Sequence, residues 1–500
     1  MHNLTHIPWL TLLLAIPMAG ALLCLVLARR PAACRWIALA ATVAVFAVAA
    51  GLFIQGNAGM GWLWWEDAPW IGRWGIRYTV GMDGLSLLLV LLSAFLLVLS
   101  VLISWREIDR HGPLYYALLL LLETGILGVF LALDLVLFYL FWEVMLIPMF
   151  LLIGIWGHER RLYAAVKFFL FTLAGSLLML LAILGLYVLH GRQTGDWTFA
   201  LAALQETAVP AGLAPWMFGA FLLAFAVKVP LVPVHTWLPD AHTEAPTAGS
   251  VILAGLLLKT GVYGLLRFGF PLFPEVALTS LPLLALLALI GIFYAAWIAY
   301  LQVDAKRLVA YSSVAHLGFV ILGIAAWNVT ALEGSILQMV NHGITTGALF
   351  ALVGMIDARA GTRRLDGLGG LWARIPVLSA FFLFFCLASL GLPGLNNFAG
   401  EILILVGAFQ ARPIWGALGM AGVVFAAAYT LRLAQGVIWG EPRDKEPWPD
   451  MTVREGLVLV PLAVMVLWLG LYPAPFLEPL REPVQLLLDS LASAPKGGLP

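Results

Sequence analysis

Four charged residues stand inside long apolar stretches of this sequence. Glu143 lies in FYLFWEVMLIPMF, Lys228 in LAFAVKVPLVP, Lys259 in LAGLLLKTGVYG and Glu401 in NNFAGEILILVG. A charge at the centre of a bilayer costs at least ~2.5–3.5 kcal/mol on insertion scales, so charges retained there generally have a function. Burial disfavours the charged form of a lysine or a glutamate, and a close partner of opposite charge favours it. A buried lysine that gains and loses an acidic partner can therefore act as a proton switch.

These residue types predict a proton relay. In this interpretation Glu143 and Lys228 form the gating pair, and the path continues to Lys259 and ends at the carboxylate of Glu401. The alternative is that Glu143 and Lys228 form a fixed ion pair that only locks two helices together. Two interruptions of the apolar segments, described below, favour transport.

Four histidines could extend this path, because imidazole titrates near neutral pH and can pass a proton between its two ring nitrogens. They are His235, His242, His316 and His342. A single histidine within a helix is often a packing residue, so for each of the four both roles stay open. As a set lining the space between Lys259 and Glu401, they would complete a path that the four charges alone leave too widely spaced.

The elements that position these residues are predicted to be membrane-spanning helices. Hydrophobic residues make up 62% of the 500 residues and charged residues 11%, with a mean hydropathy of +0.99; soluble domains have about 25% charged residues. A bilayer core about 30 Å thick requires ~20 apolar residues per helix. Such windows predict an all-α polytopic membrane protein of about fourteen helices, near residues 8–27, 36–55, 82–103, 114–133, 135–155, 163–190, 217–238, 246–270, 278–301, 307–327, 332–356, 376–409, 413–438 and 456–474.

Two of these segments contain residues that interrupt a helix. One runs KVPLVPVHTWLPDAHTEAPTAG from Lys228, and the other runs SLGLPGLNNFAGE from Ser389. Proline inside a helix removes a backbone donor and clashes with the preceding turn, and irregular backbone at membrane depth requires protein or a hydrated cavity around it. The breaks, near 228–246 and 389–401, fall in the seventh and twelfth helices. This spacing predicts two inverted five-helix repeats, as in ion-coupled transporters.

This pattern divides the chain into four parts. They are an N-terminal three-helix segment (1–110), a first five-helix repeat (111–272), a second, inverted repeat (273–440), and a C-terminal helix and tail (441–500). Cytoplasmic loops carry an excess of Lys and Arg. With the amino terminus outside, most basic residues of the connections, Lys306 among them, fall inside. We therefore expect a multi-pass protein of the cell inner (plasma) membrane with both termini in the periplasm.

Signatures of a resident cofactor are absent from the sequence. Cys24, Cys34 and Cys386 have no C-x-x-C or metal-ligand spacing, and there is no Walker loop, G-x-G-x-x-G fingerprint or H-E-x-x-H pair. The formal net charge of zero gives no indication of a nucleic-acid partner. We therefore expect neither cofactor nor metal in this chain, and its energy must come from an ion gradient or from a partner.

Four stretches carry a family resemblance: FYLFWEVMLIPMFLLIGIWG, the long segment from Lys228 to Phe268, AYSSVAHLGF and GLPGLNNFAGE. They resemble the antiporter-like membrane subunits of the proton-pumping NADH–quinone oxidoreductase, respiratory complex I. The motifs HTWLPDAHTEAPTAGS and LLLKTG are also shared with Mrp-type cation/proton antiporters and indicate only the superfamily. The pattern FWE-x-M-L-I-P-M, with Glu401 where several relatives carry lysine, resembles the subunit M family.

The resemblance implies that Glu143, Lys228, Lys259 and Glu401 match the family's proton-channel positions. It further implies L- and N-type antiporter-like subunits as neighbours in the lipid bilayer. FMN, iron–sulfur clusters and quinone reduction would belong to other subunits, so this chain would be a translocase subunit without a redox centre. Two alternatives stay open: a subunit of a multi-subunit cation/proton antiporter, and a structural membrane scaffold whose charges only lock helices together.

Overall fold

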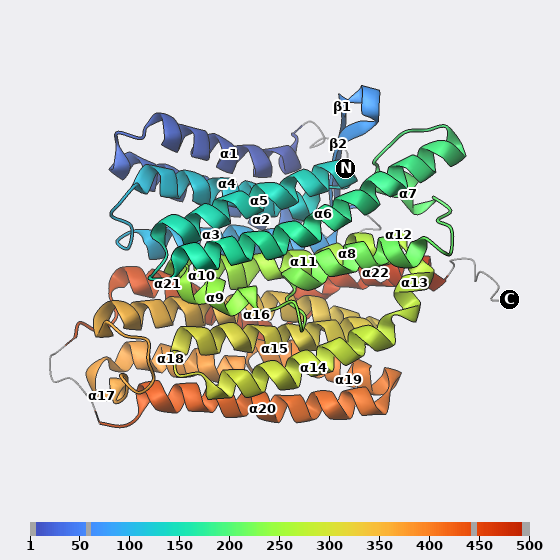
Figure 1. The fold of residues 1–500 in the computed structure, drawn as a ribbon. Helices are drawn as coiled ribbons and strands as arrows, with labels where there is room; N and C mark the ends of the chain where they lie inside the picture. The colour runs from blue at the N-terminus through green and yellow to red at the C-terminus, as the bar shows by residue number, and fades with distance from the viewer. Residues whose placement is uncertain (1–6, 57–61, 442–447, 493–500) are drawn as a thin grey trace.

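The computed structural model describes residues 7–56, 62–441 and 448–492. Most of its helices lie side by side in one bundle (Figure 1). Within the described part of the chain, twelve helices are long and apolar enough to cross a membrane. They are α1 (Trp9–Val26), α2 (Pro31–Gln55), α3 (Gly84–Ser104), α4 (Gly112–Leu131), α5 (Leu135–Trp156), α6 (Arg161–Thr194), the run α10 to α12 (Thr247–Leu272), α14 (Leu281–Leu301), α15 (Ala305–Ala326), α16 (Val329–Ala360), α20 (Pro413–Ile438) and α21 (Val453–Leu471).

The other two expected spans are the interrupted ones. The first is α8 (Ala214–Lys228), followed after residues 229–236 by α9 (Trp237–Glu244). The second is α18 (Pro376–Ser389), followed by α19 (Asn396–Ala411). Prolines in both connections remove backbone donors, and in the second Gly391 and Gly394 adopt positive φ angles of 80° and 92°. The two predicted breaks are therefore confirmed, and Lys228 is the last residue of α8.

The span that carries Lys259 is irregular as well. It consists of α10 (Thr247–Ile252), the π-helical turn η2 (Leu253–Leu257), α11 (Leu258–Gly264), a second π-helical turn η3 (Leu265–Gly269) and α12 (Phe270–Leu272). π-Helical turns are rare and frequently occur at functional sites. The apolar pattern predicted a helix here but not its irregular turns, because a widened turn leaves the composition of the segment unchanged.

A β-hairpin and a final helix were not predicted. The antiparallel strands β1 (Trp64–Ile71) and β2 (Ile76–Met82) are joined by η1 (Gly72–Trp74). A hydrogen bond from Arg77 on β2 lowers the pKa of Asp67 on β1. The last helix, α22 (Ala474–Ala492), packs against α3 and α16. The remaining short helices are α7 (Leu201–Gln205), α13 (Pro274–Thr279) and α17 (Leu371–Arg374).

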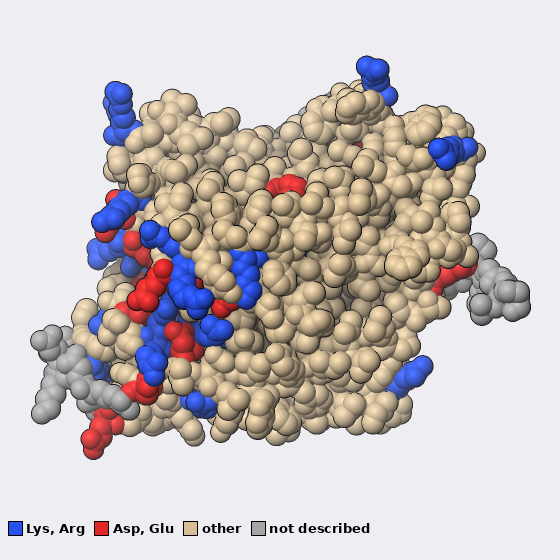
Figure 2. All heavy atoms as spheres, in the orientation of Figure 1, with Lys and Arg blue, Asp and Glu red and all other residues tan. Residues whose placement is uncertain are grey.

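The distribution of charge on the surface fits a membrane protein. In Figure 2, Lys, Arg, Asp and Glu gather mainly at the left end of the bundle, and most of the face between the two ends lacks them. Large apolar side chains are exposed along the outer helices, such as Leu181 on α6, Trp297 on α14 and Val424 on α20. In contrast, α15 and α16 are buried along most of their length. These two interior helices hold His316 and His342, two of the residues that the sequence analysis selected.

Candidate functional site

Lys259 is fully buried in the centre of the bundle and makes two polar contacts. Its Nζ donates to the carbonyl oxygen of Ala254 and lies 2.7 Å from Nδ1 of His342 on α16. Ala254 belongs to η2, so the π-helical turn supplies the carbonyl that holds the lysine. Neither contact is an acidic group. Lys259 therefore has a neighbour to which it can transfer a proton, but no counter-ion in contact among the described residues.

A second buried cluster lies around Glu401. Its Oε1 is 3.0 Å from Nδ1 of His316 on α15 and accepts a hydrogen bond of 3.1 Å from Gln338 on α16. The other ring nitrogen of His316, Nε2, is 3.1 Å from the hydroxyl of Tyr429 and 3.4 Å from Oγ of Ser389. The imidazole of His316 thus contacts an acid on one side and two hydroxyl groups on the other.

The two histidines join these clusters. The rings of His316 and His342 have centroids 5.9 Å apart, and Nε2 of His342 has no hydrogen-bond partner in the described structure. At this separation the two rings are direct neighbours. The buried side chains of Lys259, His342, His316 and Glu401 therefore form a series that crosses from α11 to α19.

Lys228 and Glu143 are not in contact. Nζ of Lys228 and Oε1 of Glu143 both lack a hydrogen-bond partner among the described residues, and no ion pair joins them there. The ammonium group lies instead 5.3 Å from the ring centroid of Trp142 and 5.5 Å from that of Phe168. Glu143 is close enough to interact electrostatically with Lys228. The structure therefore shows the expected pair in a separated arrangement.

The two histidines of the first break differ in position. His242 is fully buried, stacks on Phe350 at 4.6 Å, and has no hydrogen-bond partner at either ring nitrogen in the described structure. It interacts electrostatically with Lys259. His235 packs against the aromatic ring of Tyr294 at 5.3 Å. The structure thus brings His242 near the buried series, whereas no contact joins His235 to it among the described residues.

Several polar residues of the site were missed by the sequence analysis. Besides Gln338, Ser389 and Tyr429, an amide network fixes the start of α19 to α16. Asn341 Nδ2 donates to the carbonyl oxygen of Asn396 at 2.7 Å, and Asn396 returns a hydrogen bond of 3.0 Å to the carbonyl oxygen of Asn341. The available signal was the polar run QMVNHGITTG inside an apolar helix. This network positions Glu401, which lies further along α19.

The expectation that Lys306 lies in a loop was wrong. It occupies the first turn of α15, only 2% exposed, and its Nζ donates to the carbonyl oxygen of Ala245 at 2.5 Å. The loop assignment failed because the apolar window begins just after this residue. Within the described residues, no group of three His, Cys, Asp or Glu side chains is arranged to hold a metal ion.

The chain is similar to known proteins over nearly its whole length. Residues 132–426 match the family described as NADH:quinone oxidoreductase/Mrp antiporter, TM. NADH-quinone oxidoreductase subunit M of Escherichia coli (strain K12) is 43% identical over 488 residues, which cover 94% of this chain and 95% of that protein. The same-named protein of Pseudomonas aeruginosa is 45% identical over 487 residues, again 94% and 95%.

Two solved structures share the fold. A chain of respiratory complex I from Thermus thermophilus with bound NADH is 34% identical, with a TM-score of 0.86 over 96% of this chain and 99% of that chain. A chain of the Mrp complex from Dietzia sp. DQ12-45-1b gives a TM-score of 0.85 over 96% of this chain and 97% of that chain, at 22% identity. The second likeness, at this low identity, is evidence of fold alone.

Proposed function

Because this chain belongs to the NADH:quinone oxidoreductase/Mrp antiporter family, and to the subunit M group within it, we propose that its buried charged series is the proton path. The chain is an antiporter-like, proton-translocating membrane subunit of NADH–quinone oxidoreductase. The site assignment rests on two contacts, the one between Lys259 and His342 and the one between His316 and Glu401.

The arrangement does not suit a scaffold whose charges only lock helices together. A buried lysine that serves structure alone is normally paired with a carboxylate, because an unpaired charge in the interior is strongly destabilising. Lys228 and Lys259 have no carboxylate in contact among the described residues. Groups that gain and release protons need such freedom, since a permanent ion pair would hold the proton in place.

In the proposed mechanism protons move between neighbouring side chains. The ammonium of Lys259 gives a proton to Nδ1 of His342, the imidazole releases one toward His316, and the carboxylate of Glu401 accepts it. Each transfer breaks one bond to hydrogen and forms another. Moving one charge against a membrane potential requires ~2.3 kcal/mol per 100 mV. A change of one pKa unit supplies about 1.4 kcal/mol, so a switch must change proton affinity by roughly two units per 100 mV.

The gate of this path is proposed to be Lys228 with Glu143. When the two approach, the carboxylate stabilises the ammonium, and when they separate, the burial of Lys228 without a counter-ion favours release of its proton. The separated arrangement, with Trp142 and Phe168 around the ammonium, supports a pair that opens. His242, near Lys259, and His235, at the break itself, are both proposed as relay residues.

The proposal also includes the internal repeats, the membrane topology and the neighbouring subunits. Residues 111–272 and 273–440 would be two inverted repeats, between the N-terminal segment 1–110 and the C-terminal segment 441–500. The matched positions of the breaks at α8/α9 and α18/α19 support this division. Both termini would face the periplasm across the inner membrane. L- and N-type subunits would be the neighbours, with FMN and iron–sulfur clusters in other subunits of the complex.

The antiporter alternative has weaker support. The likeness to the Mrp complex is at 22% identity and concerns the fold, whereas the relatives 43% and 45% identical carry the name NADH-quinone oxidoreductase subunit M. Coupling to redox chemistry in partner subunits therefore accounts better for the energy source than exchange with a second cation.

The direct test is Lys259→Ala in the intact complex reconstituted into proteoliposomes. We expect the number of protons pumped per NADH oxidised to fall at least about tenfold, because removing a group that transfers protons typically costs 10²–10⁴-fold in rate. The matched control is Arg364→Gln, which removes an exposed ion pair with Asp366. Native gels would show whether both complexes assemble. Parental pumping by an assembled Lys259→Ala complex would contradict the proposed function.

A further inference from the structure

A cavity of about 340 Å³ opens between α3, α10, α16 and α21. Leu102, Ile103, Met355 and Val458 give it apolar walls, and charged side chains complete its lining. Its volume lies within the range of ligand pockets in proteins, ~300–1,000 Å³. A ligand that fits this lining combines an apolar part with a charged part.

The charged part of the lining lies where two spanning helices end. Arg106 follows closely after Ser104, the last residue of α3, and Arg454 is the second residue of α21. The ends of membrane-spanning helices lie at the level of the lipid headgroups, where long basic side chains reach the interface. Figure 2 shows charged side chains gathered at this end of the bundle. The charges of the cavity are therefore at the depth of headgroup phosphates.

Two arginines line the cavity without an acidic partner. Nη1 of Arg454 donates to the carbonyl oxygens of Leu102 and Ile103 at 3.3 and 3.1 Å, and its other nitrogens make no hydrogen bond in the described structure. Arg106 makes neither a hydrogen bond nor an ion pair within the described ranges. A guanidinium presents its N–H donors in a rigid fork that matches the oxygens of a phosphate. The pair therefore favours a phosphate ester as the ligand.

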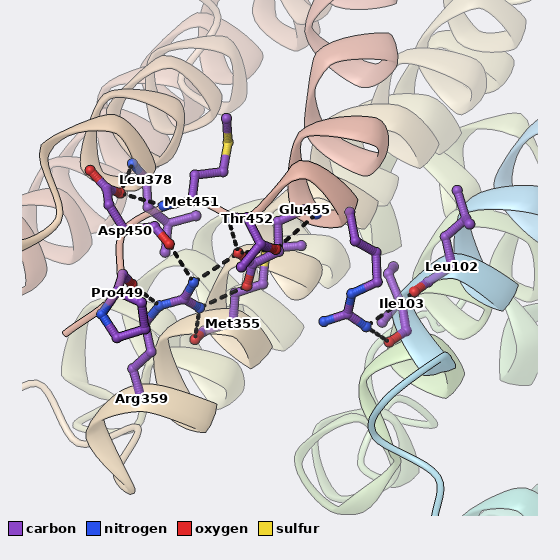
Figure 3. Close-up of polar contacts among 11 residues, drawn as sticks. Leu102, Ile103, Met355, Arg359, Leu378, Pro449, Asp450, Met451, Thr452 and Glu455 are labelled. Atoms are coloured by element: carbon purple, nitrogen blue, oxygen red, sulfur yellow. Dashed lines mark hydrogen bonds and ion pairs between the residues drawn. The ribbon is translucent and has the colours of Figure 1, made fainter.

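One of the three acids in the lining is permanently paired. Figure 3 shows that Glu455 accepts two hydrogen bonds from Arg359, at 2.7 and 2.8 Å. The same guanidinium donates to the carbonyl oxygens of Met355, Pro449 and Asp450. These bonds hold α21 against α16 and fix one wall of the cavity. The negative charge of Glu455 is therefore balanced within the protein.

Glu107 contributes an acid without a cationic partner in the described structure. Its Oε1 accepts from the backbone N–H and the hydroxyl of Thr247, at 3.0 and 2.9 Å, and both of these donors are neutral. The third acid, Asp357, has a long ion pair of 3.9 Å with Arg363. His158 adds no charge near pH 7, because burial and then nearby positive charges lower its pKa to about 4. The cavity thus offers two arginines and one unpaired carboxylate.

A stripe of exposed apolar side chains starts beside the cavity and follows α21 along its length. The members recur every three or four residues, and they are Val453, Leu457, Val460, Val464, Leu467 and Leu471. This spacing puts them on one face of the helix. The first two are chain neighbours of Arg454 and Val458, which line the cavity. A hydrocarbon chain on this face would therefore bring its polar end to the cavity.

We propose that the cavity binds the headgroup of a zwitterionic phospholipid with a primary ammonium group, a phosphatidylethanolamine. Its phosphate lies between Arg106 and Arg454, its ammonium lies against Glu107, and one acyl chain follows the stripe on α21. Such a headgroup matches both signs of charge, whereas an acidic phospholipid leaves Glu107 unbalanced. The lipid joins α3 of the N-terminal segment to α21 of the C-terminal one. This inference does not depend on the proposed proton path.

Photolabelling tests the site in the intact complex, reconstituted into vesicles that contain a phosphatidylethanolamine with a photoreactive group on one acyl chain. Peptide mapping after irradiation measures the label on α21. The label on α14, an outer helix with exposed Leu286 and Trp297 that does not line the cavity, measures contact with bulk lipid. A second probe carries the same chains on phosphatidylglycerol.

We expect the ethanolamine probe to label α21 more strongly than the glycerol probe does, each relative to its own label on α14. Equal labelling by the two probes would overturn the proposal. An unlabelled α21 would also overturn it, because a neighbouring subunit and not a lipid would then cover the stripe.

Arg106→Gln tests the phosphate contact. Because Arg106 makes no bond within the described protein, this change should leave the helices in place. Loss of hydrogen bonds to a charged group typically weakens binding at least about tenfold, so the preference of the ethanolamine probe for α21 over α14 should fall by about that factor. Arg364→Gln, at an exposed arginine paired with Asp366, is the matched control. Parental labelling of Arg106→Gln would contradict the assigned phosphate site.

Glu107→Gln tests the ammonium contact. Glutamine keeps an oxygen that can accept from Thr247 but has no negative charge. The preference at α21 should therefore move from the ethanolamine probe to the glycerol probe, a change that a purely structural role of Glu107 would not produce. If the preference is unchanged, the cavity does not recognise the ammonium and the proposal is wrong.

Inorganic phosphate distinguishes a lipid site from a site for a free anion. An excess of it should leave the label on α21 unchanged, because it lacks the chains that lie along the stripe. Loss of the label would assign the cavity to a free anion and overturn the lipid site. None of these measurements uses NADH or pumping. Lys259→Ala should be labelled like the parental complex, so failure of the lipid site and failure of the proposed function are separate results.

Discussion

Lys228 and Glu401 lie next to the two helix breaks, yet their surroundings are opposite in kind. Lys228 has aromatic faces around its ammonium and no hydrogen-bond partner in the described structure. Glu401 is held by His316 and Gln338, and its own helix is tied to α16 through Asn396 and Asn341. The charge at the first break has no hydrogen bond among the described residues, whereas the carboxylate at the second break belongs to a hydrogen-bonded network.

This difference suggests that the two breaks have different functions in proton transfer. A charge with no fixed partner changes its proton affinity strongly when one carboxylate approaches or withdraws, because no other bond compensates. A carboxylate in a hydrogen-bonded network changes little, but it offers continuous contacts along which a proton can move. We infer that the first break is the switch and the second is the conducting part of the path.

The largest effect is expected for Lys228→Arg, which tests the switch at its centre. Guanidinium remains protonated at accessible pH, so the variant should assemble but lose pumping about as completely as Lys228→Ala, at least roughly tenfold. The measurement is NADH-driven acidification of proteoliposomes, normalised to NADH oxidation. Parental pumping by Lys228→Arg would show that only a positive charge is needed at this position. The inference that the first break is the switch would then be wrong.

A graded effect is expected at Glu143. Glu143→Gln keeps the shape of the side chain but removes the charge that stabilises the ammonium of Lys228, so pumping should collapse. Glu143→Asp, shorter by one methylene, should retain part of it. Glu333→Gln, at a half-buried acid in the first turns of α16, is the control. If Glu143→Gln pumps at the parental rate in the same proteoliposome assay, Glu143 is a structural partner and the gate is assigned wrongly.

The smallest effect on pumping per complex is expected at Arg359, a charge that is permanently paired. Removing one partner of a buried pair costs about 3–5 kcal/mol, so Arg359→Gln should reduce the amount of assembled complex seen on native gels. The complexes that do assemble should pump the parental number of protons per NADH. A loss of pumping without a loss of assembly would place Arg359 in the proton path. Paired charges could then no longer be assigned to structure and unpaired charges to proton transfer.

The spans, their breaks and the presence of four charges within apolar segments were predictable from the sequence. Apolar length is a local property fixed by bilayer thickness, and proline interrupts a helix wherever the chain folds. The twelve long helices and the interrupted ones at α8/α9 and α18/α19 follow from these two rules. The types of Lys228, Lys259, Glu143 and Glu401 indicated proton chemistry for the same local reason, since each is a charge in apolar sequence.

Only the tertiary structure decided which of these groups meet. Lys259 contacts His342 across 83 positions of the chain and Glu401 contacts His316 across 85, so the helix packing selects the partners. The separation of Glu143 from Lys228 and the burial of Lys306 likewise depend on neighbouring helices. Local sequence determines whether a helix forms and which residues it carries, but contacts between distant helices depend on how their surfaces fit together.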